Sequence, residues 1–186
     1  RDWSVTGVQT CALPISSDGF VEGFGAALLA RIAREAPGVR LRFLSKADKD
    51  SAPLREGMID LETGVVSGKT SPELRTCALF EDRFIGVVRA GHSLARGRMT
   101  AERFATGQHI GVSRLGDGRG PIDDALAAQG LERRIGAILG GFAAALALVR
   151  KSDLIASVPE RHTQALRAGL HSFPLPVATP ALTVSL

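Results

Sequence analysis

The chain has 186 residues and a net charge of +4, with 45% apolar and 23% charged residues. This composition is typical of a globular protein, and no apolar run reaches the roughly 18 residues that a membrane-spanning helix needs. The lysines and arginines are spread along the chain, which does not favour a nucleic-acid-binding surface. Two cysteines are too few for a disulfide framework, so the sequence favours a reducing compartment, the cytoplasm.

Residues 1–16, RDWSVTGVQTCALPIS, show neither helical nor strand periodicity. They do not form a signal peptide, because polar residues interrupt the apolar core that such a peptide requires. Residues 5–15 resemble the translation of a common indexed sequencing-library adapter, and the neighbouring adapter and index bases account for the other residues. We therefore interpret residues 1–16 as a non-native, adapter-derived segment. If these residues form a strand, we expect it to occupy an otherwise empty strand position in a sheet and to carry no information about function.

From residue 17 to residue 82, helical and strand patterns alternate. Residues 18–36 place Phe24, Leu28 and Ile32 on one helical face, with Asp18 as the expected N-cap. We expect strands over residues 39–44, 60–66 and 74–80, and a short helix over residues 51–57. A turn-rich loop over residues 67–73 separates the last two of these strands.

The same alternation continues to the end of the chain. The patterns predict strands over residues 83–91, 109–114, 134–139, 153–159 and 181–186. Helices are expected over residues 99–106, 121–129, 142–152 and 160–168, the second with Pro121 in its first turn. Short strands separated by helices favour an α/β architecture with mostly parallel strands, arranged as two small sheets.

The sequence contains no motif that indicates catalysis. It has no P-loop, no G-x-S-x-G and no H-E-x-x-H, and no two of its four histidines have the spacing of a helical metal site. Cys77 has no neighbours that would activate a thiol, and Asp123 and Asp124 are explained by the dipole at the start of a helix. We therefore expect no enzyme activity, no cofactor and no metal.

Three helix starts that follow strands or the first segment are better candidates for ligand binding. They lie at residues 17–20, 113–120 and 139–146. A helix start presents free backbone N–H groups and the positive end of the helix dipole, so an anionic ligand would suit it. In α/β folds such ends line the crevice where small ligands bind.

Several segments in this order resemble the effector-binding domain of LysR-type transcriptional regulators. They are PGVRLRF, LREGMIDLETGV, LFEDRFIGVVRAGHSLA and DLIASVPERH, and the similarity extends over residues 17–186. The sequence departs slightly from the family at HSL, where the common form is His-Pro-Leu.

The resemblance implies a type 2 periplasmic-binding-protein-like fold, in which crossover strands join two α/β lobes. Residues 17–82 and 181–186 would form the first lobe, and residues 83–180 the second. On this comparison the first lobe is incomplete at both ends, so we expect poor solubility or partial unfolding. The resemblance also implies that an N-terminal winged helix-turn-helix, which would bind DNA, is missing from this fragment.

The resemblance further implies a small, anionic effector bound between the lobes. The residues that would line the cleft are Ser17, Asp18, Ser113, Arg114, Gly140, Gly141 and Phe142, with Ser67 and Lys69 as weaker candidates. The full-length protein would be a cytoplasmic homodimer or homotetramer. Two alternatives remain: a solute-binding protein of the same fold that serves a transporter, and an enzyme on this scaffold.

Overall fold

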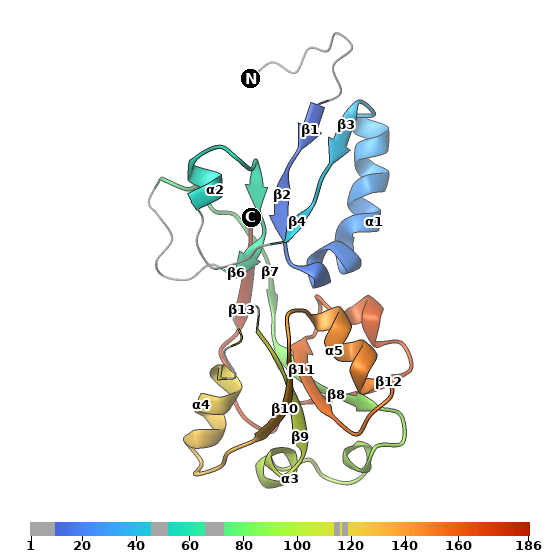
Figure 1. Cartoon of the computed structure of the whole chain (residues 1–186), viewed down its shortest axis with the longest axis vertical. Helices are drawn as coiled ribbons and strands as arrows, with labels where there is room; N and C mark the ends of the chain where they lie inside the picture. The colour runs from blue at the N-terminus through green and yellow to red at the C-terminus, as the bar shows by residue number, and fades with distance from the viewer. Residues whose placement is uncertain (1–9, 46–51, 66–72, 114–115, 117–118) are drawn as a thin grey trace.

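The computed structural model of the chain describes residues 10–45, 52–65, 73–113, 116 and 119–186. These residues form two α/β lobes joined by two crossover strands (Figure 1). We call the elements from β1 to β6 lobe I and those from β8 to β12 lobe II. The predicted two-lobe α/β architecture is therefore confirmed, and the exact lobe boundaries stay a prediction.

Lobe I is built from short strands and one long helix. Its elements are β1 (Thr10–Ala12), β2 (Pro14–Ser16), α1 (Asp18–Glu35), β3 (Val39–Leu41), β4 (Leu44–Ser45), α2 (Ala52–Arg55), β5 (Leu61–Glu62) and β6 (Gly64–Val65). Strand β2 lies between β4 and β5, parallel to both, and β1 pairs with β3. Helix α1 begins one residue earlier than expected: its N-cap is Ser17 rather than Asp18, because the Ser17 hydroxyl accepts the Phe20 N–H at 3.3 Å.

The central strand of lobe I comes from the segment that resembles an adapter. Ile15 on β2 is 9% exposed, and the Ser16 hydroxyl lies 2.6 Å from the Thr63 hydroxyl. The Leu13 N–H also donates to the Asp60 carboxylate at 2.9 Å. Residues 10–16 thus fill a strand position, as we expected they could. The adapter interpretation stays a prediction, and we base no functional argument on this pairing.

Lobe II is built around one five-stranded mixed sheet in the order β10-β9-β11-β8-β12. Its elements are β8 (Phe84–Arg89), α3 (Ala101–Ala105), β9 (Gln108–Val112), α4 (Pro121–Ala127), β10 (Arg134–Leu139), α5 (Phe142–Val149), β11 (Ile155–Pro159) and β12 (Leu170–Pro174), with 3₁₀ turns at Ser93–Ala95 and Gln164–Arg167. Strands β9, β10 and β11 are parallel, whereas β8 runs antiparallel to β11 and β12. The sheet is therefore less parallel than expected, because β8 enters it directly from the crossover.

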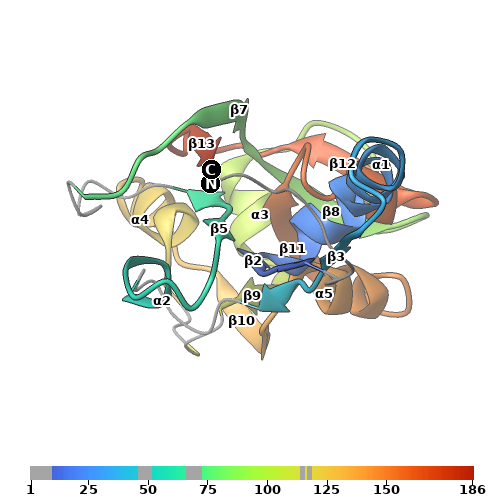
Figure 2. The same cartoon turned by 90° about the horizontal axis from the view of Figure 1, so that it is seen from above.

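Both faces of the lobe II sheet are covered. One face packs against α3 and α4 through Phe104, Ile122 and Leu126, and the other packs against α5 through Leu146 and Val149. Seen from above, α4 lies on the opposite side of the molecule from α1 and α5 (Figure 2). Gly86 on β8 is required by this packing, since a Cβ there would lie 2.3 Å from the ring of Phe173. Strands covered on both faces read as apolar runs.

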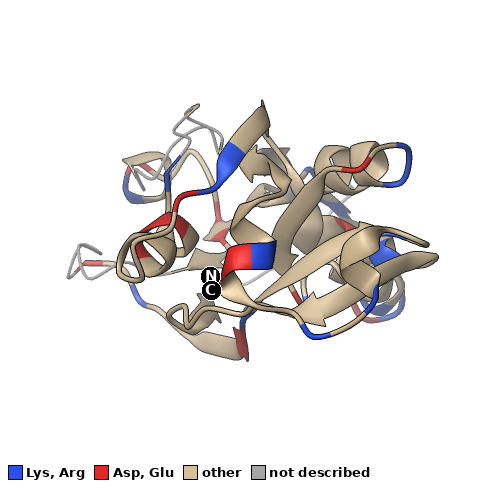
Figure 3. Cartoon of the chain, turned by 90° about the horizontal axis from the view of Figure 1, so that it is seen from below, with Lys and Arg blue, Asp and Glu red and all other residues tan. Residues whose placement is uncertain are grey.

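The two crossover strands, β7 (Ala78–Asp82) and β13 (Leu182–Ser185), are antiparallel partners. Strand β13 also pairs with β6 of lobe I, and β7 continues directly into β8 of lobe II. Seen from below, acidic and basic residues are interspersed over this face of the molecule (Figure 3). Among the described helices, none has the length and apolar character needed to cross a membrane.

Candidate functional site

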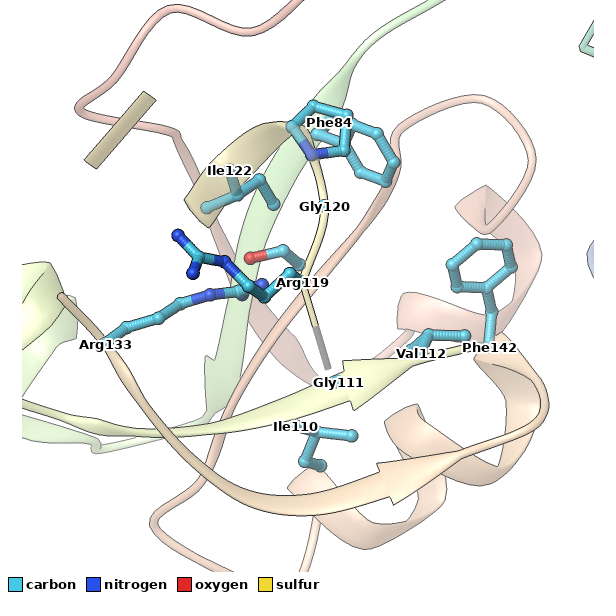
Figure 4. Close-up of a pocket in the computed structure, with 11 residues that line it drawn as sticks. Phe84, Ile110, Gly111, Val112, Arg119, Gly120, Ile122, Arg133 and Phe142 are labelled. Carbon is cyan, nitrogen blue, oxygen red and sulfur yellow. The ribbon is translucent and has the colours of Figure 1, made fainter. Parts of the chain in front are cut away.

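A cavity of about 100 Å³ opens at one edge of the lobe II sheet (Figure 4). It lies where β8 leaves the crossover and where helices α4 and α5 begin. Its lining residues, all from lobe II, are Phe84, Ile110, Gly111, Val112, Arg119, Gly120, Pro121, Ile122, Arg133, Phe142 and Ser157. We call this cavity the lobe II pocket.

The direction of the strands explains why the pocket forms here. Strands β9, β10 and β11 are parallel, so their carboxyl ends meet at one edge of the sheet. The chain turns from β9 into α4 and from β10 into α5 at that edge. Because β8 is antiparallel to β11, its first residue, Phe84, reaches the same edge. This is the position at which α/β sheets bind small ligands.

One buried ion pair fixes the wall of the pocket at α4. The Arg133 guanidinium donates to both oxygens of Asp123, at 2.7 and 2.8 Å, and the two side chains are 7% and 11% exposed. Asp123 also accepts the Gly120 N–H at 2.8 Å. Burial would raise the pKa of Asp123, but the hydrogen bonds and charge of Arg133 and the Gly120 amide outweigh it, so the pKa is lowered.

This pair changes the expected electrostatics of the site. The start of α4 was expected to offer free N–H groups to an anion, yet the Gly120 N–H is already bound by Asp123. The charge of Arg133 is likewise compensated. Arg119 is exposed at the rim, and within the described residues it forms no ion pair with an acidic side chain. Among the described residues that line the pocket, Arg119 is therefore the cation without an acidic partner.

The other walls of the pocket are apolar apart from one hydroxyl. These apolar walls are formed by Phe84, Ile110, Ile122 and Phe142. Phe142 lies on the opposite side of the pocket from Arg119 (Figure 4). Ser157 on β11 is 6% exposed, and its Oγ has no hydrogen-bond partner within the described part of the chain. Apolar walls with a few polar groups are typical of small-molecule sites.

The structure brings several of the sequence-predicted residues to this edge of the sheet. Phe142 is the first residue of α5 and lines the pocket. Gly140 and Gly141 join β10 to α5, with Gly141 as the N-cap. The Ser113 N–H follows β9 and donates to the Leu139 carbonyl at 2.9 Å. Whether Ser113, Gly140 and Gly141 contact a ligand stays a prediction.

The other predicted residues lie in lobe I or outside the described residues. Ser17 caps α1 and Asp18 is the first residue of that helix. The start of α1 meets the start of α5, since a Cβ on Gly19 would lie 3.5 Å from the Phe142 ring. Lobe I therefore approaches the pocket at Phe142. The predicted residues that lie outside the described residues are Arg114, Ser67 and Lys69.

A second cluster holds the two lobes together beside the pocket. Asp82, at the end of β7, accepts the N–H groups of Arg83, Arg161 and His162 at 2.8, 2.9 and 3.0 Å. It also lies 3.1 Å from Nδ1 of His162. Burial would raise the pKa of Asp82, but these hydrogen bonds outweigh it and lower the pKa. We call Asp82, His162 and the aromatic residues around them the interlobe clasp.

The aromatic part of the interlobe clasp comes from both lobes. The ring of Phe24 on α1 lies 5.3 Å from the ring of Phe80 on β7, and Phe80 lies 5.6 Å from His162. The ring of Phe20 lies 5.1 Å from the ring of Phe24, tilted by 46° to it, and a Cβ on Gly23 would lie 3.2 Å from the His162 carbonyl. This close approach fixes α1 against lobe II, so the position of α1 beside the pocket depends on the clasp.

Sequence reasoning missed Arg119, Arg133 and Ser157. A signal for Ser157 was present, because it is the single polar residue in the apolar strand Ile155–Pro159. Arg133 lies ten residues after Asp123, a separation at which no helical or strand rule predicts a contact. In the parts of the chain that the structure describes, no three His, Cys, Asp or Glu side chains are grouped to hold a metal ion.

Comparisons with known proteins agree on one family. Residues 16–186 match the LysR substrate binding domain. The transcriptional activator NagR of Ralstonia sp is 29% identical over 86% of this chain, which spans 54% of NagR. The probable transcriptional regulator PA0477 from Pseudomonas aeruginosa superposes with a TM-score of 0.84 at 28% identity, covering 96% of this chain and 61% of that one. The BenM effector-binding domain with its effector benzoate has a TM-score of 0.71 at 19% identity, covering 97% and 84%.

Proposed function

Because the chain belongs to the LysR substrate-binding domain family, we propose that it senses a small anionic effector for a DNA-binding transcriptional regulator. The observation that carries the proposal is the lobe II pocket, whose apolar walls end at Arg119, a residue with no ion pair within the described part of the chain. The start of α1, next to Phe142, places lobe I where a bound effector would influence it. A ligand that binds one lobe arrangement more tightly shifts the population toward it.

The charges of the pocket favour an effector with a single negative charge. Arg133 is neutralised by Asp123, so it adds no net attraction, and Arg119 supplies one positive charge. A planar guanidinium binds a carboxylate through two parallel hydrogen bonds. A carboxylate on Arg119 would leave the rest of the effector against Phe84 and Phe142. The benzoate of BenM, a small monocarboxylate, is of this class.

The remaining parts of the proposal concern the whole protein. The chain spans about half the length of NagR, so DNA binding would reside in an N-terminal winged helix-turn-helix outside these 186 residues. We propose that the whole protein is a cytoplasmic homodimer or homotetramer. The alternative is a solute-binding protein that serves a transporter. The relatives named as transcriptional regulators favour the regulator over this alternative. The upstream reading frame in a cleanly assembled genome distinguishes them: a winged helix-turn-helix supports the regulator, and an export signal contradicts it.

Calorimetric titration tests the pocket with four monocarboxylates: butyrate, 3-hydroxybutyrate, benzoate and 3-hydroxybenzoate. We expect at least one to bind, and Arg119→Ala to weaken it by about tenfold or more, because a charge-assisted hydrogen bond contributes roughly 1.5–3 kcal/mol. The matched control is Arg98→Ala, which removes an exposed arginine that does not line the pocket. Equal loss of affinity in both variants, or no loss with Arg119→Ala, would contradict the proposal.

A further inference from the structure

Ser157 occupies a position where packing alone would place an apolar residue. Strand β11 is buried along its whole length, and its other members are isoleucine, alanine, valine and proline. The strand lies between β8 and β9, with Ser157 opposite Gly86 of β8. Burying a hydroxyl at the centre of a covered sheet lowers the stability of the fold unless the hydroxyl is hydrogen-bonded.

The side chain of Ser157 is directed to the pocket rather than to α5. Alternate residues of a strand face opposite sides of the sheet. Ala156 and Val158 pack in the cluster formed with α5, whereas Ile155 packs in the cluster formed with α3 and α4. Ser157, two residues after Ile155, therefore faces the α4 side, where it lines the pocket with Ile122.

Three other buried hydroxyls that the structure describes, those of Ser16, Thr63 and Thr163, have partners. The Thr163 hydroxyl donates to the Pro159 carbonyl at 2.6 Å, and the Ser16 and Thr63 hydroxyls lie 2.6 Å apart. The Ser157 Oγ has no such partner among the described residues, although the side chain is 6% exposed. The hydroxyl is thus unexplained by the fold and is available to a group that enters the pocket.

The surroundings of Ser157 favour a neutral partner. The pocket that Ser157 lines is otherwise apolar at Phe84, Ile110 and Ile122, and Arg133 in the same lining is already paired with Asp123. A carboxylate placed there would be buried without a counter-ion, which is unfavourable. A hydroxyl or carbonyl group carries no such penalty. The charged end of the ligand would remain at Arg119, on the exposed rim.

Resting on the proposed function, we propose that Ser157 is the specificity-determining residue of the lobe II pocket, selecting monoanions that carry a second, neutral hydrogen-bonding group. A site with a buried hydrogen-bonding group discriminates strongly against ligands that lack the matching group, because its own group is then left unpaired. Arg119 supplies attraction to the charge that all such ligands share. Ser157 distinguishes among them.

The test uses two pairs of probes that differ by one hydroxyl: butyrate with 3-hydroxybutyrate, and benzoate with 3-hydroxybenzoate. In the unmodified chain we expect the hydroxylated member of at least one pair to bind about tenfold more tightly, the effect of one net hydrogen bond. In Ser157→Ala the preference should fall below about threefold, while the affinity for the other member of the pair stays the same. Calorimetry on both proteins measures these ratios.

Thermal unfolding of the same variant provides a second readout. Because the hydroxyl has no partner in the fold, Ser157→Ala should melt at the same temperature as the unmodified chain or higher. The matched control is Ser185→Ala, which removes an equally buried serine, also 6% exposed, on β13 outside the pocket; it should keep the hydroxyl preference. A lower melting temperature for Ser157→Ala would mean that the hydroxyl has a structural role and would overturn the proposal.

The outcomes separate this inference from the proposed function. Binding of the probes without a hydroxyl preference, or a preference that survives Ser157→Ala, overturns the role of Ser157 and leaves the pocket intact. Failure of all four probes to bind overturns both proposals. An affinity for the probes that is unchanged in Arg119→Ala contradicts the proposal that the effector binds in this pocket. This holds for either result with Ser157→Ala.

Discussion

In lobe II the strands β8 and β11 are buried along most of their length, whereas β5 and β6 of lobe I leave Leu61 and Val65 exposed. Both apolar clusters of the described residues belong to lobe II. In lobe I the buried aliphatic side chains that the structure describes are Ile15 and Ile59. Leu29 on α1 and Val65 on β6 are 50% and 55% exposed.

This difference indicates that the two lobes have different roles. Burial of a large apolar side chain contributes about 1.5–3 kcal/mol, so lobe II has most of the stabilising contacts. Lobe I is held mainly by short strands, by the crossover and by the interlobe clasp at Asp82 and His162. A rigid lobe that carries the pocket and a weakly held lobe beside it are suited to a sensor, because moving elements come from the less stable part of a protein.

We expect the largest loss of unfolding free energy when a core aromatic side chain of lobe II is truncated. Phe104 is 0% exposed and packs at the centre of the α3 and α4 cluster. Phe104→Ala should lower the free energy of unfolding by about 3–5 kcal/mol, through lost burial and a cavity. Urea unfolding followed by circular dichroism measures the change, and a loss below about 1 kcal/mol would show that lobe II is not the stable unit.

Acidification should weaken lobe II through His109. This side chain is 0% exposed, its Nε2 bonds the Phe104 carbonyl at 2.7 Å, and burial lowers its pKa from 6.5 to about 4. Between these values the unfolded chain binds a proton that the folded chain does not, so stability falls as the pH falls from 6.5 to 4. The expected loss is about 3 kcal/mol.

Unfolding in urea at pH 7, 5.5 and 4 measures this slope, and His109→Gln removes the titrating group. The lowered pKa values of Asp82 and Asp123 add most of their own loss below the usual carboxyl value of 3.8, at the acid limit of this window. A variant with the same slope between pH 6.5 and 4 as the unmodified chain would exclude His109 as the cause.

Breaking the interlobe clasp should have a smaller effect that is concentrated in lobe I. Asp82→Asn replaces a carboxylate that accepts four N–H groups by an amide with one acceptor oxygen. We expect a loss of about 2 kcal/mol, together with faster amide exchange in α1. The control Glu81→Gln, at the exposed neighbouring position, should change neither quantity. Unchanged exchange in α1 would show that the clasp does not hold lobe I.

The smallest effect is expected on the surface of lobe I. Leu29 is 50% exposed on α1, and alanine is the better helix former, so Leu29→Ala should change the unfolding free energy by less than about 0.5 kcal/mol. The same denaturation measurement applies. A loss similar to that of Phe104→Ala would mean that this face of α1 is covered in solution.

Much of lobe II could be predicted from local patterns. Apolar runs located β10 at Arg134–Leu139 and β11 at Ile155–Pro159. Strand β11 is buried along its whole length, as its apolar residues predict, whereas β10 lies at the edge of the sheet and is partly exposed. The helix expected over residues 160–168 is a 3₁₀ turn at Gln164–Arg167 instead. The amides of Arg161 and His162 bind Asp82, which lies about 80 residues away in the sequence, and no local pattern reveals that constraint.

The candidate site was harder to predict, because its polar groups depend on long-range contacts. The dipole argument accounted for Asp123, yet its partner Arg133 is brought to it only by the turn between α4 and β10. Phe142, which the family resemblance implied and which lies in the helix start expected at residues 139–146, lines the pocket. The antiparallel direction of β8, which brings Phe84 to the pocket, follows from the crossover rather than from the composition of the strand.

Peptide-resolved hydrogen–deuterium exchange of the chain tests the central claim, that a rigid lobe carrying the pocket is joined to a weakly held lobe I. Amide protection rises with the free energy of the opening that exposes the amide. We predict that amides of β8, β9 and β11 exchange slowest. Amides of β2, β5 and β6 should exchange at least about a hundredfold faster, a difference of roughly 3 kcal/mol. Equal protection in both lobes would contradict the account.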